Sequence, residues 1–239
     1  MGKMTKCKES ISVVFPAYNE ESNIGTLIDQ TIQILPEFTD KWEIIVVDDG
    51  STDRTEDIVR RYTNNISINI SIIRHPSNMG YGAALKSGII SAKNDLIFFT
   101  DSDLQFDIKE LSKLLQWVSE YDIVIGYRTK RQDPFYRRLN AFGWNTLIRL
   151  MLGLRVKDIN CGFKIFRKNV FDKISIDAVG AMVNADILSQ AVKFGFRIKE
   201  VPVRHYPRLK GKQTGANIRV IFKAFKELMR LHNKLKINA

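Results

Sequence analysis

Short apolar runs alternate with stretches of helical periodicity along the N-terminal half of the chain. Four runs have the length and composition of buried strands: Ile11–Phe15, Trp42–Val47, Ile66–Ile73 and Leu96–Phe99. Helical patterns lie between them, from Ile24 to a point before Pro36, from a capping Asp53 through Tyr62, and from Ala83 to Ala92. This alternation predicts an α/β fold with a mostly parallel central sheet and helices on both faces.

Polar residues follow three of these runs, at the point where each predicted strand ends. They are Asn19 with Glu20, Asp48 with Asp49, and Asp101 with Asp103. Because the carboxyl ends of parallel strands meet at one edge of a sheet, the three loops should converge on one crevice. Each loop alone is also explained as a cap of the next helix. Their shared edge favours a ligand site.

Asp101-Ser102-Asp103 suggests what that ligand contains. Two carboxylates one residue apart repel each other unless a positive group lies between them. Mg²⁺ is usually held by one or two carboxylates together with substrate phosphates, and Mn²⁺ prefers the same oxygen ligands. The pattern therefore predicts a divalent cation that bridges a diphosphate. The alternative is a solvated turn or a helix cap.

Net charge is the compositional feature that most restricts the partners. The 239 residues are 44% hydrophobic, enough for one sizeable core, and carry a formal charge of +11. Such a charge indicates an anionic binding partner, which could be nucleic acid, phosphates or anionic lipid. We find no signal-peptide pattern and no run of about 20 apolar residues that could span a membrane. Cys7 and Cys161 have no metal-ligand spacing, which fits a reducing compartment.

Four motifs occur in the order and at the separations of a known enzyme family. They are Pro16-Ala17-Tyr18-Asn19-Glu20, Val46-Val47-Asp48-Asp49-Gly50-Ser51, Asn78-x-Gly80-x-Gly82 and Asp101-Ser102-Asp103-Leu104-Gln105. Together they resemble the family-2 inverting glycosyltransferases with the GT-A fold, a Rossmann-like fold of nucleotide-sugar transferases. Within that family the chain is most similar to dolichyl-phosphate mannose and glucose synthases and to bacterial polyprenyl-phosphate glycosyltransferases. The resemblance runs from about Ile11 to Gly215.

This resemblance implies roles for individual residues. The residues implied to bind the nucleotide sugar in these motifs are Pro16, Tyr18, Glu20, Val47, Asp49 and Ser102. Asp101, Asp103 and Gln105 are implied to hold Mg²⁺ or Mn²⁺ with the diphosphate, and the two aspartates count as catalytic. A dinucleotide site of the form G-x-G-x-x-G is the rival interpretation of Gly80–Leu85. It lacks the third glycine and follows the third predicted strand rather than the first.

A basic segment follows a further predicted strand at Asp122–Gly126. Five basic residues and one acid lie between Arg128 and Arg138. A charge run is usually a solvated face, but the arginine side chain also suits phosphate recognition. The resemblance implies that Arg128 contacts the donor diphosphate as a catalytic residue. It implies that the acceptor phosphate is bound by Arg131, Arg137 and Arg138.

The C-terminal third contains three further features. Leu139–Leu154 is apolar on nearly every side, which suits either a buried helix or a helix in a membrane interface. Asn184 and Asp186 open a helix that borders the active site in relatives, although Asp186 is equally explained as a cap. A basic loop follows the short predicted strand Val201–Val203. There the resemblance implies that Arg208 and Lys212 close over the leaving diphosphate.

The C-terminus combines an apolar stripe with positive charge. Between Asn217 and Lys236, apolar residues recur at helical spacing, and basic residues are interspersed among them. From Arg204 to Lys236 there are ten basic residues and one acid, which accounts for +9 of the net charge of +11. Packing explains the stripe but not the charge. We therefore expect a catalytic domain over residues 1–215 and a basic amphipathic helix over 216–239 that contacts a membrane surface or packs on the domain.

The combined prediction is a metal-dependent transferase. It would move a hexose from a nucleotide-diphosphate sugar, GDP-mannose or UDP-glucose first, to a polyprenyl (dolichyl) monophosphate with inversion. A phosphate monoester with a second pKa of about 6 is already ionised at neutral pH, so no dedicated base is required. We expect the enzyme on the cytosolic face of a membrane, as a peripheral protein that could work with a membrane-anchored partner subunit.

Two alternatives remain at this stage. The first keeps the enzyme but uses a soluble glycan or protein as the acceptor. The absence of an acceptor base, the arginine-rich segment and the basic tail argue against it. The second is a non-enzymatic, basic nucleic-acid-binding protein. Here the basic residues alternate with an apolar stripe, and aromatic side chains are not arranged as stacking platforms, so we expect no nucleic acid partner.

Overall fold

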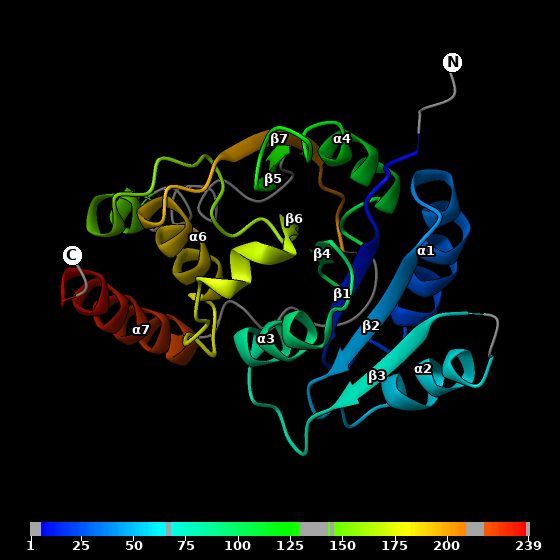
Figure 1. Cartoon of the computed structure of the whole chain (residues 1–239). Coiled ribbons are helices and arrows are strands. Elements are labelled where there is room, and N and C mark those ends of the chain that lie inside the picture. The colour runs from blue at the N-terminus through cyan, green and yellow to red at the C-terminus, as the bar shows by residue number, and fades with distance from the viewer. Residues whose placement is uncertain (1–5, 66–67, 130–142, 144–145, 209–217, 238–239) are drawn as a thin grey trace.

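A seven-stranded sheet lies at the centre of the described residues, with the strand order β3-β2-β1-β4-β6-β5-β7 (Figure 1). The strands are β1 Ile11–Ala17, β2 Trp42–Asp48, β3 Ile70–Arg74, β4 Leu96–Thr100, β5 Ile123–Thr129, β6 Phe163–Arg167 and β7 Ile198–Arg204. The first four strands are parallel, β5 is parallel to β7, and β6 is antiparallel to both β4 and β5. The predicted mostly parallel sheet is confirmed.

The structure is a computed structural model that describes residues 6–65, 68–129, 143, 146–208 and 218–237, without the side chains of 218–224 and 235–237. The helices are α1 Ile24–Phe38, α2 Thr55–Thr63, α3 Tyr81–Ser91, α4 Leu111–Leu115, α6 Val183–Lys193 and α7 Ile218–Ile237. Residues 146–152 are also helical, and short 3₁₀ helices cover Ile108–Glu110 and Lys168–Asp172.

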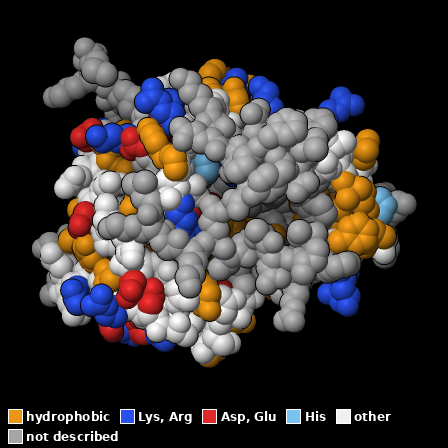
Figure 2. Space-filling model, turned by 180° about the vertical axis from the view of Figure 1, so that it is seen from behind, with side chains coloured by type: hydrophobic (Ala, Val, Ile, Leu, Met, Phe, Trp, Pro, Cys, Tyr) orange, Lys and Arg blue, Asp and Glu red, His pale blue; other side chains and the backbone are white. Residues whose placement is uncertain are grey.

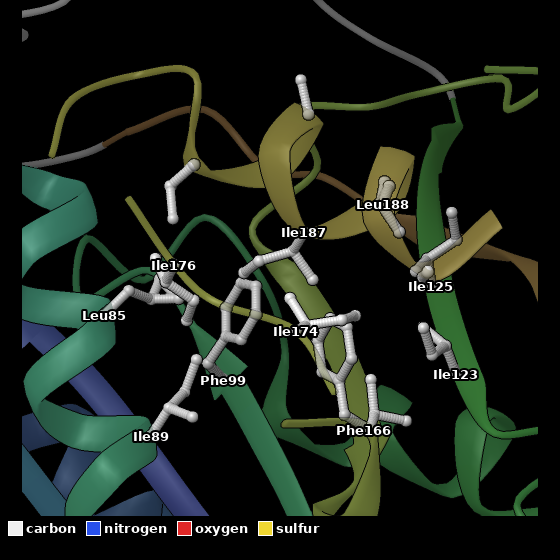
Figure 3. Close-up of a cluster of buried hydrophobic side chains, with 14 of the residues drawn as sticks. Leu85, Ile89, Phe99, Ile123, Ile125, Phe166, Ile174, Ile176, Ile187 and Leu188 are labelled. Atoms are coloured by element: carbon white, nitrogen blue, oxygen red, sulfur yellow. The ribbon is translucent and has the colours of Figure 1, made fainter. Parts of the chain in front are cut away.

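Side chains along each strand alternate between two hydrophobic clusters, one on each face of the sheet. On β4, Phe98 belongs to the cluster covered by α1, α2 and α4, whereas Phe99 belongs to the cluster covered by α3 and α6. Figure 3 shows Phe99 among Leu85 of α3 and Ile187 of α6, and its ring stacks on Phe166 of β6 at 5.7 Å between centroids. Helices therefore cover both faces, as predicted.

Helix α1 differs from its prediction at the C-terminal end. It continues through Pro36 to Phe38, whereas the sequence predicted an end before Pro36. Pro36 lacks an N–H and so removes one helical hydrogen bond from the last turns of α1. Phe38 is buried in the core, and the N–H of Thr39 donates to the carbonyl of Leu35 at 3.0 Å. Packing thus preserves the last turn.

Several strand ends also differ from the prediction, and β7, for example, covers Ile198–Arg204 rather than Val201–Val203. β1 extends to Ala17, because its parallel pairing with β2 continues to the pair Ala17 and Asp48. β3 covers Ile70–Arg74 rather than the predicted Ile66–Ile73, of which residues 66–67 lie outside the described part of the chain.

Helix α7 packs one face against the domain. Leu228 and Leu231 are buried in the same cluster as α3 and α6. Lys234 forms an ion pair with Asp177 at 2.5 Å, and Nδ1 of His232 lies 2.7 Å from the carbonyl oxygen of Met151. The last contact joins α7 to helical residues 146–152. The predicted C-terminal helix is therefore present, and part of its apolar stripe is accounted for by packing.

Candidate active site

The loops after β1, β2 and β4 meet at one edge of the sheet, as the sequence predicted. The N–H of Asp49 donates to the carbonyl of Ala17 at 2.8 Å. The hydroxyl of Ser102 donates to the carbonyl of Pro16 at 2.8 Å, and the N–H of Asn19 donates to Oγ of Ser51 at 2.9 Å. These bonds cross between loops that are far apart in the sequence, so the three loops form one structural unit.

Asp101 and Asp103 lie at the centre of this unit. Oδ1 of Asp101 accepts the hydroxyl proton of Tyr81 at 2.8 Å, and Oδ1 of Asp103 accepts the N–H of Gln105 at 3.1 Å. Burial raises the pKa of Asp101. Burial, together with the charge of Asp101, raises the pKa of Asp103 to about 6. Both carboxylates are thus poorly compensated as anions.

A divalent cation fits this pair chemically, because its charge would offset both the burial and the mutual repulsion. Among the described residues, no group of three or more His, Cys, Asp or Glu side chains could hold a metal ion. The chain would therefore supply two carboxylates, with the side-chain oxygen of Gln105 still a predicted ligand, and leave the remaining positions to phosphate oxygens and water, as is usual for Mg²⁺. In Gln105, Nε2 donates to the carbonyl of Tyr206 at 3.0 Å, so this side chain also holds the segment after β7.

Arg208 reaches the same edge from the far end of the sequence. Its Nη2 lies 2.7 Å from Oε1 of Glu20 and its Nη1 lies 3.6 Å from Oδ2 of Asp103. All three side chains are largely buried, with exposed fractions of 11–14%. The guanidinium thus supplies positive charge where two loops meet. The structure brings together Glu20, Asp103 and Arg208 as predicted, whereas Lys212 lies outside the described residues.

Asp49 contacts His75, a residue that was not predicted to belong to the site. Oδ1 of Asp49 lies 2.7 Å from Nδ1 of His75 and accepts the N–H of Met79, and Oδ2 accepts the N–H of Gly80. Nε2 of His75 lies 2.9 Å from Oγ of Ser87 on α3. Asp49 therefore holds the loop after β3 in place, and its contact with the nucleotide stays a prediction. His75 follows a strand directly, which is the signal that could have identified it.

The glycines of Asn78-x-Gly80-x-Gly82 allow the backbone of residues 178–179 to approach. The N–H of Gly82 donates to the carbonyl of Val179 at 2.9 Å, and the N–H of Ala83 does so at 3.3 Å. A Cβ at position 82 would overlap the carbonyl oxygen of Ala178. Because a protein carbonyl already accepts from these donors at the start of α3, the geometry argues against the rival dinucleotide interpretation.

Arg128 forms a bidentate ion pair that was not predicted. Its Nε and Nη2 donate to the carboxylate of Asp158 at 2.7 and 2.8 Å. The side chain of Arg128 is 17% exposed, and its contact with a diphosphate stays a prediction.

Tyr18 and Val47, both predicted to contact the nucleotide, differ in exposure. Tyr18 is 37% exposed, whereas the side chain of Val47 is fully buried in the core. Because the whole residue, backbone included, is 0% exposed, the structure does not support the predicted contact of Val47 with the nucleotide.

The other predicted residues are placed only in part. Arg131, Arg137 and Arg138 lie outside the described residues. Asn184 and Asp186 do open α6, as predicted. The carboxylate of Asp186 does not cap that helix. Instead, it accepts the N–H groups of Asp177 and Ala178 at 3.0 and 3.1 Å, which holds the segment that approaches Gly80 and Gly82.

The pKa of Asp103 leads to a stability prediction. A folded-state pKa of about 6, against an ordinary value of 3.8, means that the folded chain binds more protons between these two pH values. Stability present at low pH is therefore lost as the pH rises through about 6. Asp103→Asn should remove this cost, so the metal-free variant should be more stable than the wild type near pH 7.5, by about 3 kcal/mol at most. Near pH 3, below the ordinary value of 3.8, the two should be about equal.

Thermal or urea unfolding in EDTA at both pH values would measure this difference. Asp57→Asn, at an exposed position on α2, is the matched control and should change stability little at either pH. Loss of stability in Asp103→Asn at both pH values would mean that Asp103 acts mainly as a stabilising partner of Arg208.

Comparison with known proteins places this geometry in a family. Residues 12–175 match the model of glycosyl transferase family 2. A dodecaprenyl-phosphate galacturonate synthase of Rhizobium johnstonii is 31% identical over 84% of this chain and 60% of its own length. A dolichyl-phosphate beta-glucosyltransferase of Trichomonas vaginalis is 32% identical over 81% of this chain and 64% of its own length. The chain thus spans less than two thirds of either relative.

A solved structure supports the fold. Glucosyl-3-phosphoglycerate synthase of Mycobacterium tuberculosis, in complex with Mn²⁺, UDP-glucose and phosphoglyceric acid, superimposes with a TM-score of 0.74. The match covers 94% of this chain and 80% of that one, at 20% sequence identity. A likeness at this identity establishes architecture alone, and it confirms the predicted glycosyltransferase fold. With the match over residues 12–175, the chain belongs to glycosyl transferase family 2.

Proposed function

We propose that this chain transfers a hexose from a nucleotide-diphosphate sugar to a polyprenyl (dolichyl-type) monophosphate, with inversion at the anomeric carbon. The observation that carries the proposal is the buried pair Asp101 and Asp103 at the sheet edge, with Arg208 beside it. Relatives named for polyprenyl-phosphate and dolichyl-phosphate acceptors support the choice of acceptor. Membership of an enzyme family argues against the nucleic-acid-binding alternative.

The residues at the site suit this reaction. Asp101 and Asp103 would hold Mg²⁺ or Mn²⁺, which would neutralise the nucleoside diphosphate as it leaves. Arg208, which lies 3.6 Å from Asp103, would contact the same diphosphate. An acceptor phosphate with a second pKa of about 6 is ionised at neutral pH, so the chain needs to position it rather than deprotonate it.

A membrane surface is the proposed location of the enzyme, because a polyprenyl chain stays within a bilayer. Among the described residues, no helix is long and apolar enough to cross a membrane. Leu150 is 79% exposed, and Phe225 and Met229 on α7 are 46% and 41% exposed. Lys226 and Arg230 beside them are exposed too. Figure 2 shows hydrophobic side chains gathered at the edge of the molecule that carries α7, with basic side chains near them.

This combination of exposed apolar and basic side chains suits peripheral docking on an anionic leaflet. Because nucleotide sugars are cytosolic, the proposed face of the membrane is the cytosolic one. A membrane-anchored partner subunit would serve the same purpose and is compatible with this surface.

A panel of nucleotide sugars, each labelled in the sugar, would test the proposed activity. The purified chain is incubated with GDP-mannose, UDP-glucose or UDP-N-acetylhexosamine, together with a polyprenyl phosphate, and the lipid product is extracted into organic solvent. We expect label in the organic phase for one of the donors, and none when polyprenyl alcohol replaces the phosphate. Label transferred only to a soluble acceptor such as phosphoglyceric acid would contradict the proposed acceptor class.

The arginine-rich segment provides a separate prediction about the acceptor. Arg138→Ala should reduce transfer to polyprenyl phosphate by about tenfold or more, because loss of a charge-assisted contact costs roughly 1.5–3 kcal/mol. Slow hydrolysis of the donor by water should change much less. Both rates are measured on the same preparation, and Lys130→Ala is a neighbouring control. Equal loss of both activities in Arg138→Ala would mean that this residue serves the donor or the fold.

A further inference from the structure

Lys164 on β6 is a buried charged residue that the proposed reaction does not use. Its side chain is fully buried, which is costly for an ammonium group unless hydrogen bonds compensate it. Nζ donates to Oδ1 of Asn184 at 2.9 Å and to the carbonyl oxygen of Cys161. It also lies 5.5 Å from the ring centroid of Phe99. Burial lowers the pKa of Lys164 to about 8, so the group stays mostly charged at neutral pH.

The carbonyl that Lys164 binds belongs to the turn of residues 158–162, which forms the wall behind Asp101. The N–H of Asp101 donates to the carbonyl of Gly162 at 3.2 Å. Gly162 lies so close that a Cβ there would overlap the carboxylate of Asp101. The position of this carboxylate is therefore restricted by both Gly162 and the hydroxyl of Tyr81.

The turn is held at both of its ends. At the start, the carboxylate of Asp158 accepts hydrogen bonds from Nε and Nη2 of Arg128, and the carbonyl of Asp158 accepts the N–H of Cys161 at 3.3 Å. Near the end, the bond from Lys164 fixes the Cys161 carbonyl. Asn184 at the start of α6 accepts a second hydrogen bond from the same ammonium group. A substitution of Lys164 would therefore loosen the turn of residues 158–162 that packs against Asp101.

We propose that Lys164 is a positioning residue for the cation–diphosphate site: with Asn184 it fixes the turn of residues 158–162 and thereby the orientation of the Asp101 carboxylate. The inference deepens the proposed function and rests on it. In this role, Lys164 contacts neither the substrate nor the metal. It acts through the Cys161 carbonyl and Gly162, so its loss should weaken binding that depends on the metal and spare binding that does not.

Calorimetric titration of Lys164→Met with UDP and with GDP, each in Mn²⁺ and in EDTA, tests this. Methionine keeps the length and apolar stem of the side chain but removes the donors. We expect the Mn²⁺-dependent gain in nucleotide affinity to fall by about tenfold or more, as is typical for groups that orient metal ligands. Affinity in EDTA should change less than about threefold. Lys168→Met, at an exposed position just after β6, should leave both affinities unchanged.

A second variant covers the case in which Lys164→Met does not fold. Asn184→Leu keeps the ammonium and removes its side-chain acceptor, and it should reduce the same Mn²⁺-dependent gain. An unchanged gain in whichever of the two variants folds would overturn the positioning role, even if the melting temperature fell. If the wild type itself gained no nucleotide affinity from Mn²⁺, the metal site of the proposed function would fail first.

Discussion

Asp103→Ala is expected to reduce the turnover of sugar transfer by about 10²–10³-fold, the usual cost of removing a group that stabilises charge in the transition state. Asp103 is largely buried, sits beside Asp101 and lies 3.6 Å from Arg208. Its removal would deprive a bound cation of one of two carboxylates. EDTA should abolish wild-type activity, and added Mn²⁺ or Mg²⁺ should restore it. Initial rates at saturating donor measure both effects.

Asp57→Ala is the matched control, because Asp57 lies exposed on α2 and should leave turnover unchanged. Circular dichroism would check that the Asp103 variant is folded. Full activity of the wild type after dialysis against EDTA would refute the metal assignment. A raised KM with unchanged kcat in Asp103→Ala would mean instead that the residue contributes only uniform binding of the donor.

The second large effect concerns the membrane. Reversal of Lys223, Lys226 and Arg230 to glutamate should release the protein from vesicles that contain phosphatidylserine. Each basic residue near an anionic surface contributes about 1 kcal/mol, so three reversals should weaken binding by roughly 3–6 kcal/mol. Lys226 and Arg230 are exposed, whereas Leu228 and Leu231 hold the helix to the core. The melting temperature should therefore change little. Co-sedimentation and calorimetry measure the two quantities.

A control variant separates a local effect from one of net charge. Lys41, Arg61 and Lys86 are exposed residues outside α7, and their reversal changes the net charge by the same amount. This control should still co-sediment with the vesicles. Wild-type binding by the α7 variant, or its unfolding, would show that the helix serves packing rather than docking.

The shared edge of the sheet could be predicted from the sequence because it depends on local patterns. The run Leu96–Thr100 is fully buried and ends directly before Asp101. Similar runs end before Tyr18 and Asp49. Parallel strands place such ends side by side whatever the rest of the chain does. The three loops therefore meet in the structure as the residue patterns indicated.

Contacts between distant segments could not be predicted in this way. The five residues of β6 include the charged Lys164 and Arg167, so the segment lacks the pattern of a buried strand, yet it lies antiparallel between β4 and β5. That placement brings Gly162 into contact with Asp101, and it brings Lys164 close to the same turn. Likewise, 188 positions separate Glu20 from Arg208. Such pairs follow from tertiary packing, in which side-chain fit rather than spacing decides the outcome.

The glycine at position 82 has a consequence for comparing sequences across relatives. It lacks a side chain because the carbonyl of Ala178, almost a hundred positions later, occupies that space. A relative with a larger residue at this position must therefore carry a shorter or displaced segment where this chain has residues 177–180. Substitutions at the two places should appear together during divergence. A glycine pattern that resembles a phosphate-binding loop can thus arise because a segment distant in the sequence packs against those glycines.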